Sequence, residues 1–482
     1  MTEELALTGI LQGAAARLSA ARWSGTKDAG ALAVTGLFRL FEDRGAEFFA
    51  AIFSFPPDGT RYYVPFVLSE RRSGGLRPLE AGGNLTLAEA ETERRFLDFT
   101  VTAMRRRKRL AGKGATLAWD GVPVPGGALA DIERLGGDTT NVVVKFRLGH
   151  KRLVLKSYRT ADDFNPEPEL LSFLSSKGSR TVPKVLGSVR LEAVPTTDAV
   201  SGPRSELASG QLHAGRPVVL GLLSELASGV PAFPAFVGNA RRSVSRRLPP
   251  HDCIPARLGI AVGDLHHLLS TRGAPADIRP EAISDEDIGR WRSLMRRRFE
   301  TADLALSSEK AASLAQAREA FERLLAGMDG WAGARKLRTH QDLHLGQVLI
   351  SRGGFRILDF EGEPLRTGPE RIEKLPPERD VATMLRSFSY ASAVALKELK
   401  AQDEKEVQRA RQWEQGASTS FVEGYLSACP RAVRKRGKKR LLMAVRLWMA
   451  EKALYEVAYE AKFRPEWVNI PLDGFQRILG DG

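Results

Sequence analysis

The most informative stretch of this 482-residue chain is HQDLHLGQVLISRGGFRILDFEG, at residues 340–362. Two apolar runs of β-type residues flank a Gly-Gly turn there, which predicts a β-hairpin. If the turn centres near Gly353, then Gln347 and Asp359 lie opposite each other at the open end of the hairpin. Asp342 comes five residues before Gln347 and is expected in the loop that leads to the same end.

Three oxygen-bearing side chains would therefore converge beside the hairpin. Transfer of a phosphoryl group to an alcohol needs a carboxylate near the acceptor hydroxyl and hard oxygen ligands for Mg²⁺ between the phosphates. Asp342 suits the first role, as the catalytic residue, and Gln347 with Asp359 suits the second, as metal ligands. Each alone could be an ordinary polar residue at a loop end, but the three at this spacing predict a phosphotransferase.

The pattern resembles that of the protein-kinase-like and aminoglycoside phosphotransferase superfamily. Its members usually carry asparagine at the amide position, where this chain has Gln347. With DLHLGQVL at 342–349 and DFEGEP at 359–364, the stretch is similar to bacterial maltokinases, which are stand-alone or fused to trehalose synthase. The related glucosamine kinases share much of the pattern. The resemblance implies an α+β, bilobal protein-kinase-like fold with an N-terminal α+β cap, and ATP and Mg²⁺ as cofactors.

This resemblance covers most of the chain. RWSGTK at 22–27 is similar to the opening of the family's cap, and RDVA at 379–382 and KALYEVAYEAK at 452–462 match stretches nearer the C-terminus. One stretch departs from the maltokinase pattern. After the segment 218–226, the usual acidic residues with Gly and Trp are replaced by ASGVPAF.

Composition and periodicity predict a smaller mixed lobe, which starts with an α+β unit built on a meander at 1–115, followed by a larger, mostly helical lobe. The resemblance then implies that 1–115 form the cap, 116–228 the rest of the ATP-binding lobe, and 229–482 a helical lobe with the catalytic loop and the sugar-binding region. A stretch rich in Pro, Ser, Gly and Thr at 193–217 predicts a loop. The cap strands are expected at 33–41, 48–55 and 61–67. The helices of the last part are expected at 255–270, 285–326, 379–400, 404–428 and 439–463.

The ATP-binding lobe has a Gly-rich turn, GGDTTN, at 136–141. Backbone N–H groups can approach phosphates in such a turn because glycine has no Cβ. The turn lacks the G-x-G-x-x-G spacing, so an ordinary hairpin explains it as well. Its candidate nucleotide contacts are Gly137, Asp138, Thr139 and Thr140.

Lys156 lies on an alternating strand and is placed to hold the ATP phosphates if a carboxylate orients it. NPEPE at 165–169 predicts a helix start, with Asn165 as the N-cap. The resemblance favours Glu169 as the partner of Lys156 and leaves Glu167 as the alternative. The backbone of Glu225 and Leu226 is the expected contact for adenine. A solvated strand lysine beside helix-start acids is the plain alternative.

In the resembled family the C-terminal helices line the sugar pocket. Aromatic side chains that stack on sugar rings, beside carboxylates that accept hydrogen bonds from hydroxyls, suit a polyol. An amphipathic core helix with a charged edge explains the helical residues among them equally well. The candidate sugar contacts are His344, Tyr455, Glu456, Tyr459, Glu460 and Trp467.

Charge and composition restrict the other functions. Lys and Arg number 72 against 58 Asp and Glu, a net charge of +14 that favours anionic partners without choosing among them. The basic runs at 296–298 and 434–440 lack interleaved aromatics, so no nucleic-acid partner is expected. No apolar run approaches the ~18 residues of a membrane span. Acidic residues where a signal peptide needs basic ones, and only two cysteines, indicate a cytoplasmic protein.

The resemblance implies an ATP:sugar phosphotransferase. Maltose is the favoured acceptor, phosphorylated at its anomeric hydroxyl to maltose 1-phosphate for α-glucan and glycogen synthesis, and an association with trehalose synthase is a further expectation. The nearest alternative is a glucosamine kinase or another sugar or aminoglycoside-type kinase, because Glu456 and Glu460 could pair with an ammonium. A non-catalytic nucleotide-binding scaffold is the alternative of another class. Such a scaffold would not require Lys156, Asp342, Gln347 and Asp359 together.

Overall fold

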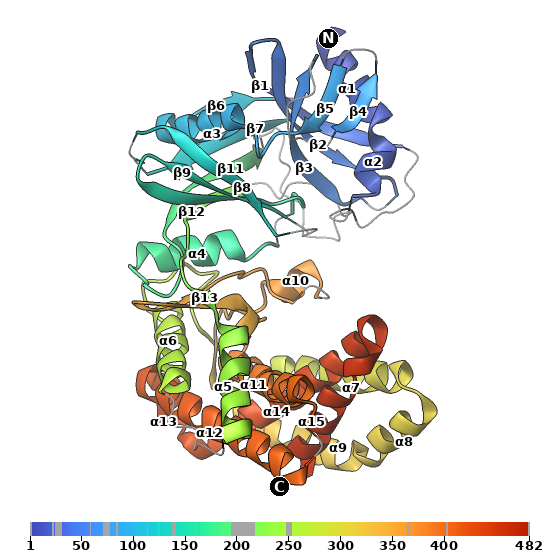
Figure 1. Cartoon of the computed structure of the whole chain (residues 1–482), viewed down its shortest axis with the longest axis vertical. Helices are drawn as coiled ribbons and strands as arrows, with labels where there is room; N and C mark the ends of the chain where they lie inside the picture. The colour runs from blue at the N-terminus through green and yellow to red at the C-terminus, as the bar shows by residue number, and fades with distance from the viewer. Residues whose placement is uncertain are drawn as a thin grey trace. The chain divides into compact units, whose positions relative to one another are not determined.

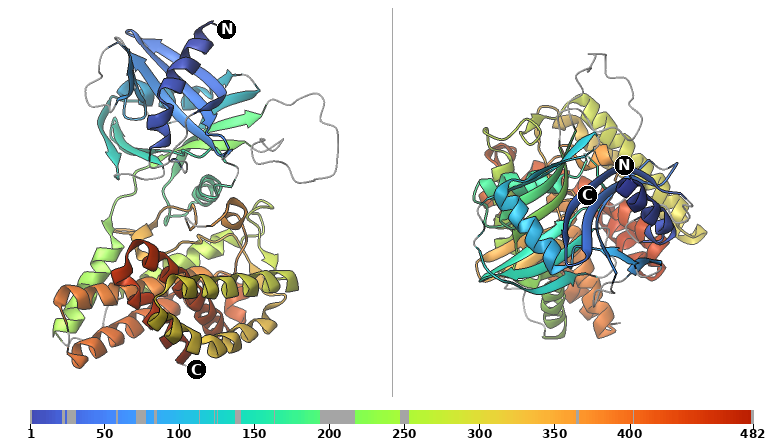
Figure 2. Two further views of the ribbon diagram at one scale, coloured as in Figure 1. Left: turned by 90° about the vertical axis from the view of Figure 1, so that its right-hand side faces the viewer. Right: turned by 90° about the horizontal axis from the view of Figure 1, so that it is seen from above.

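The computed structural model places two compact units in the chain (Figures 1 and 2). The N-terminal unit comprises Met1–Pro168 and Lys184–Leu226, and the C-terminal unit comprises Glu169–Pro183 and Ala227–Gly482. The residues that the structure describes are 2–21, 24, 31–57, 59–70, 78–82, 85–112, 114–122, 124, 126–136, 141–162, 164–193, 217–246, 253–363, 366–401 and 403–480.

A five-stranded antiparallel sheet begins the N-terminal unit, in the order β1-β2-β3-β5-β4. Strand β2 is apolar from Phe48 to Phe53, where both of its faces are buried. Phe49 and Phe53 pack with Leu11 of the first helix, which lies along one face of the sheet in Figure 2, while Phe48 and Ile52 join the core on the other face. The predicted meander is confirmed. The elements are α1 (Thr2–Gly13), α2 (Ala15–Ser19), β1 (Ala33–Asp43), β2 (Ala46–Ser54), β3 (Arg61–Ser69), β4 (Pro78–Gly82) and β5 (Leu85–Glu89).

A seven-stranded antiparallel sheet follows, in the order β6-β7-β11-β12-β10-β9-β8. It starts at Arg109, so the change from one sheet to the next lies before residue 115, where the sequence indicated a boundary. Helix α3 packs against β7, β8 and β11 of this sheet. Of the loop predicted at 193–217, residues 194–216 lie outside the described residues. The elements are α3 (Arg94–Arg106), β6 (Arg109–Ala111), β7 (Ala115–Gly121), β8 (Leu129–Leu135), β9 (Val142–Leu148), β10 (Lys151–Ser157), β11 (Val185–Ala193) and β12 (Val218–Glu225).

The two sheets of the N-terminal unit are joined where β10 ends. An isolated antiparallel bridge pairs Thr160 with Tyr62 of β3. Arg159 is fully buried and makes ion pairs with Glu91 and, at 3.0 Å, with Glu89. The residues that directly follow the strand with the candidate ATP lysine are therefore paired with the five-stranded sheet.

The C-terminal unit is mostly helical, as predicted. The middle of helix α14 is largely buried, and the helix packs against α7, α11 and α15. Helices α6 and α12 approach so closely that a Cβ on Gly259 would lie 2.0 Å from the carbonyl oxygen of Phe421, so only glycine fits there. The stretch of helical periodicity at 285–326 forms three helices. The larger helices are α5 (Ala232–Arg246), α6 (Ile254–Leu269), α7 (Asp285–Ala305), α8 (Ser308–Gln316), α9 (Arg318–Ala326), α11 (Glu378–Leu399), α12 (Glu404–Ala428), α14 (Lys438–Phe463) and α15 (Asn469–Gly480).

Short elements complete this unit. They are α4 (Glu167–Ser176), β13 (Val230–Pro231), β14 (Glu281–Ala282), η1 (Gly327–Trp331), β15 (Arg335–Lys336), η2 (Leu345–Gln347), β16 (Val348–Ser351), β17 (Gly354–Ile357), α10 (Gly368–Arg371), α13 (Arg431–Lys435) and η3 (Pro465–Trp467). Helix α4 begins with Glu167 and Pro168, which belong to the N-terminal unit. Among the described residues, no helix is both long enough and apolar enough to cross a membrane.

Candidate active site

The predicted hairpin is formed by β16 and β17, with Val348 opposite Ile357 and Ser351 opposite Gly354. At its open end the Gln347 Nε2 donates a hydrogen bond to the Asp359 Oδ2 over 3.0 Å. Asp359 has a positive φ of 63°, a conformation that aspartate tolerates better than most residues. The predicted proximity of these two side chains is therefore observed. That they hold Mg²⁺ stays a prediction, which their oxygen donors suit.

The loop before the hairpin is held through its backbone by a buried carboxylate on α11. The N–H groups of His340 and Gln341 donate to Asp380 at 2.8 and 3.0 Å, and His266 of α6 lies 3.1 Å from the same carboxylate. Burial alone would raise the pKa of Asp380, but the contacts with His266 and the His340 backbone lower it. An ionised Asp380 can thus hold Gln341 at its positive φ of 68°, directly before Asp342.

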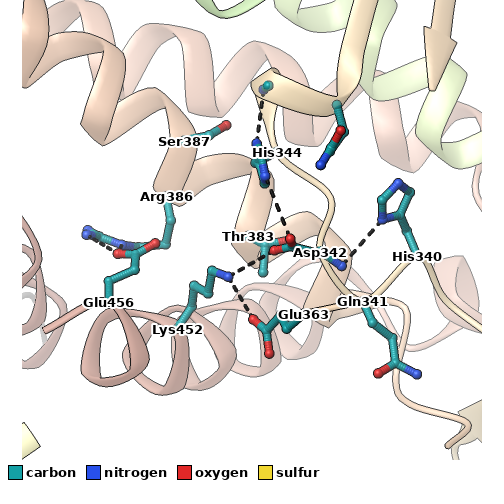
Figure 3. A network of polar contacts seen from close by, with 12 residues as sticks. His340, Gln341, Asp342, His344, Glu363, Thr383, Arg386, Ser387, Lys452 and Glu456 are labelled. Carbon is teal, nitrogen blue, oxygen red and sulfur yellow. Dashed lines mark hydrogen bonds and ion pairs between the residues drawn. The ribbon is translucent and has the colours of Figure 1, made fainter. Parts of the chain in front are cut away.

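The Asp342 side chain is 15% exposed and faces two basic groups (Figure 3). Lys452 Nζ, from α14, lies 3.2 Å from the Asp342 Oδ1, and His344 Nε2 lies 3.8 Å from its Oδ2. The His344 Nδ1 accepts a hydrogen bond from the Gly346 N–H, and burial lowers the pKa of this histidine. Asp342 therefore contacts one cation directly and a mainly neutral imidazole at longer range.

Lys452 also pairs with Glu363 at 2.7 Å, and neither residue was among the candidates from the sequence. Burial alone would lower the pKa of Lys452, but the negative charges of Glu363 and Asp342 raise it. The sequence does carry a signal for this lysine. Glu451-Lys452 is a charged pair inside a long apolar helical run, and charges in such a position are normally paired.

The candidate sugar contacts on α14 are already engaged with other residues. Glu456 accepts two hydrogen bonds from Arg386, at 3.0 and 2.7 Å, and burial raises the pKa of its carboxyl. Glu460 accepts hydrogen bonds from Tyr390, at 3.0 Å, and from Arg464. Their use for a sugar would require sharing these bonds and stays a prediction.

The aromatic candidates lie beside cations. Lys452 Nζ is 4.6 Å from the centre of the Tyr455 ring, which brings this residue close to Asp342. Tyr459 stacks at 6.3 Å on Tyr455. Trp467 lies under Lys397 at 4.1 Å. Stacking of a sugar on any of these rings stays a prediction.

Lys156 makes its ion pair with Glu167, the alternative partner, at 2.5 Å. The Tyr158 hydroxyl donates to the same carboxylate at 2.8 Å. The Asn165 side chain accepts from the Glu167 N–H, as a capping residue does, and this fixes Glu167 at the first turn of α4. Glu169, the favoured partner, belongs to the C-terminal unit and forms an ion pair with Arg338 at 3.6 Å. The observed ion pair is thus the one with the alternative partner, Glu167, and a contact of Glu169 with Lys156 stays a prediction.

Two further nucleotide candidates have their N–H groups bonded inside the N-terminal unit. Glu225 donates to the Lys184 carbonyl and Leu226 to the Arg152 carbonyl, both at 2.9 Å. An adenine contact through these N–H groups would have to share those bonds. The Gly-rich turn candidates, Gly137, Asp138, Thr139 and Thr140, lie outside the described residues.

Comparison with known proteins gives consistent matches. A family model described as "Phosphotransferase enzyme family" matches residues 131–413. A glucosamine kinase of Mycolicibacterium smegmatis is 27% identical over 325 residues, which are 66% of this chain and 72% of that protein. A glucosamine kinase of Streptacidiphilus jiangxiensis is 26% identical over 217 residues, 45% of this chain and 47% of that protein.

The fold is also found among solved structures. A glucosamine kinase in complex with glucosamine, ADP and inorganic phosphate has a TM-score of 0.69 at 19% identity, with 98% of this chain and 99% of that one covered. A second crystal form of a glucosamine kinase gives the same TM-score, with 95% and 96% covered. These likenesses show that the expected kinase-like α+β fold is correct.

Proposed function

The chain belongs to the phosphotransferase enzyme family, and from this we propose that it is an ATP-dependent sugar kinase whose acceptor is glucosamine or a related amino sugar. One observation carries the chemistry. A partly buried aspartate, Asp342, lies in a loop fixed by buried hydrogen bonds, just before a hairpin whose open end brings together the Gln347 amide and the Asp359 carboxylate. A scaffold protein has no need of that combination.

In the proposed reaction the sugar hydroxyl oxygen bonds to the γ-phosphorus of ATP, the bond from that phosphorus to the β–γ bridging oxygen breaks, and ADP leaves. Asp342 orients the hydroxyl and takes up its proton. Lys156, oriented by Glu167, holds phosphate oxygens. Gln347 and Asp359 would hold Mg²⁺, which would neutralise the charge on the phosphates.

The acceptor assignment rests on the relatives, and it revises the first expectation. Maltose was the favoured acceptor, with glucosamine as the alternative. Two glucosamine kinases match by sequence and two glucosamine kinase structures match by fold, so the amino sugar is now the better supported acceptor. Maltose phosphorylation and an association with trehalose synthase stay predictions on which no comparison bears.

A panel of acceptors in an ATP-consumption assay tests the proposal. Glucosamine, glucose, N-acetylglucosamine, maltose and an aminoglycoside would each be offered with ATP-Mg²⁺, and products would be identified by mass. We expect turnover with glucosamine, a lower kcat/KM with glucose, which lacks the ammonium that a carboxylate such as Glu456 or Glu460 would bind, and little with N-acetylglucosamine. Turnover of maltose but not of glucosamine would mean that maltose, and not an amino sugar, is the acceptor. ATP binding without turnover of any acceptor would favour the scaffold alternative.

A further inference from the structure

Lys452 is a buried cation that none of the roles above uses. Its side chain is 8% exposed and comes from the middle of α14. Removing an ammonium from water is costly unless it is paired and hydrogen-bonded. Here it lies between two carboxylates, 3.2 Å from the Asp342 Oδ1 and 2.7 Å from the Glu363 Oε1 (Figure 3).

Glu363 holds the other end of this contact. It is fully buried and receives Arg366 at 2.9 Å and Arg379 at 2.8 Å in addition to Lys452. Burial alone would raise the pKa of Glu363, but Arg379, Lys452 and Arg366 lower it well below its usual range. The three cations therefore favour the ionised form of Glu363, which anchors Lys452.

The same anchor also reaches the backbone beside the catalytic candidate. Arg379, which pairs with Glu363, donates a hydrogen bond to the Gln341 carbonyl oxygen. The contacts close a ring that runs from Asp342 through Lys452, Glu363 and Arg379 to Gln341, the residue covalently bound to Asp342. Both the side chain and the preceding peptide of Asp342 are thus fixed to one buried carboxylate.

The two oxygens of Asp342 consequently differ. Oδ1 lies 3.2 Å from the Lys452 ammonium and is bound by it, whereas Oδ2 lies 3.8 Å from the His344 Nε2, which is too long for a hydrogen bond. A carboxylate held by one oxygen has a defined orientation for the other.

We propose that Lys452, anchored by Glu363, is a positioning residue for phosphoryl transfer. It binds the Asp342 Oδ1 and thereby directs Oδ2 to the acceptor hydroxyl. The inference rests on the proposed function and adds to it a residue of α14 that acts on the acceptor side. In this proposal Lys452 contacts Asp342 and not the substrate. Its removal should therefore lower kcat and leave the binding of both substrates almost unchanged.

Kinetics of Lys452→Met and Lys452→Gln, with Lys452→Arg as the conservative variant, test the proposal. A displacement of about 1 Å in a catalytic group can cost about 10²-fold, so we expect kcat to fall about 10²-fold in the first two variants. The KM values for ATP and sugar should stay within about threefold of the parent's. The kcat of Lys452→Arg should be at least tenfold higher than that of Lys452→Met, since arginine keeps the charge. Lys462→Met is the matched control, because Lys462 is an exposed lysine on the same helix, and its kcat should be unchanged.

Several outcomes would overturn the inference. They are an unchanged kcat in a folded Lys452→Met protein, a loss expressed mainly as a higher KM for ATP, and a Lys452→Arg protein no more active than the glutamine variant. If Met and Gln both fail to fold, as judged by thermal melting, a folded Lys452→Arg protein whose kcat falls about 10²-fold, or whose KM for ATP or sugar rises more than about threefold, would overturn the inference. A parent that phosphorylates no sugar would instead remove the proposed function itself.

Discussion

Lys156 in the N-terminal unit and Lys452 in the C-terminal unit are both largely buried lysines paired with a glutamate, but their partners differ in sequence distance. Lys156 pairs with Glu167, eleven residues further along the chain. Lys452 pairs with Asp342 and Glu363, at separations of 110 and 89 residues. The first pair depends on one strand and the next helix. The second depends on how α14 packs against the rest of its unit, so local sequence alone cannot define it.

The largest expected effect comes from the residue that Lys452 holds. Asp342→Asn should lower kcat by about 10²–10⁴-fold, the usual contribution of a positioned acid or base, while ATP affinity and the melting temperature stay near those of the parent. Asp264→Asn is a suitable control, because Asp264 is exposed on α6. Turnover retained in Asp342→Asn would contradict its assigned role, and the role of Lys452 with it.

The local pair gives the next effect. Lys156→Met and Glu167→Gln should each raise the KM for ATP by about 10–100-fold, since a hydrogen bond to a charged group is worth about 1.5–3 kcal/mol. Glu169→Gln is the matched control and should change the KM less than threefold. Equal effects at the two glutamates would mean that both orient Lys156, and a larger effect at Glu169 would reverse the assignment.

The smallest effect is expected at the hairpin, where the contact is also local. Asp359→Asn and Gln347→Ala should each raise the Mg²⁺ concentration needed for half-maximal activity, because each would remove an oxygen ligand of the ion, and the neutral amide of Gln347 should matter less than the carboxylate of Asp359. A titration with Mg²⁺ at saturating ATP measures both. If neither variant changes the Mg²⁺ requirement, these residues are not the metal ligands.

The difference between local and distant contacts also explains what could be predicted. The hairpin, and the contact of Gln347 with Asp359, follow from alternating residues around a Gly-Gly turn. The sequence reduced the partner of Lys156 to two glutamates, and the structure shows an ion pair with Glu167, whose N–H is capped by Asn165. Lys452 and Glu363 could not be paired from sequence, because only the packing of α14 brings them together.

The bridge between Thr160 and Tyr62, with Arg159 buried against Glu89 and Glu91, bears on how the gene can be divided. A shortened protein beginning at residue 116 would keep Lys156. It would lack Glu89 and Glu91, the two carboxylates that pair with the buried Arg159. Breaking one buried pair typically costs about 3–5 kcal/mol, a large share of the stability of an ordinary domain. For expression or domain exchange, the first 115 residues are therefore inseparable from the strand that carries the ATP lysine.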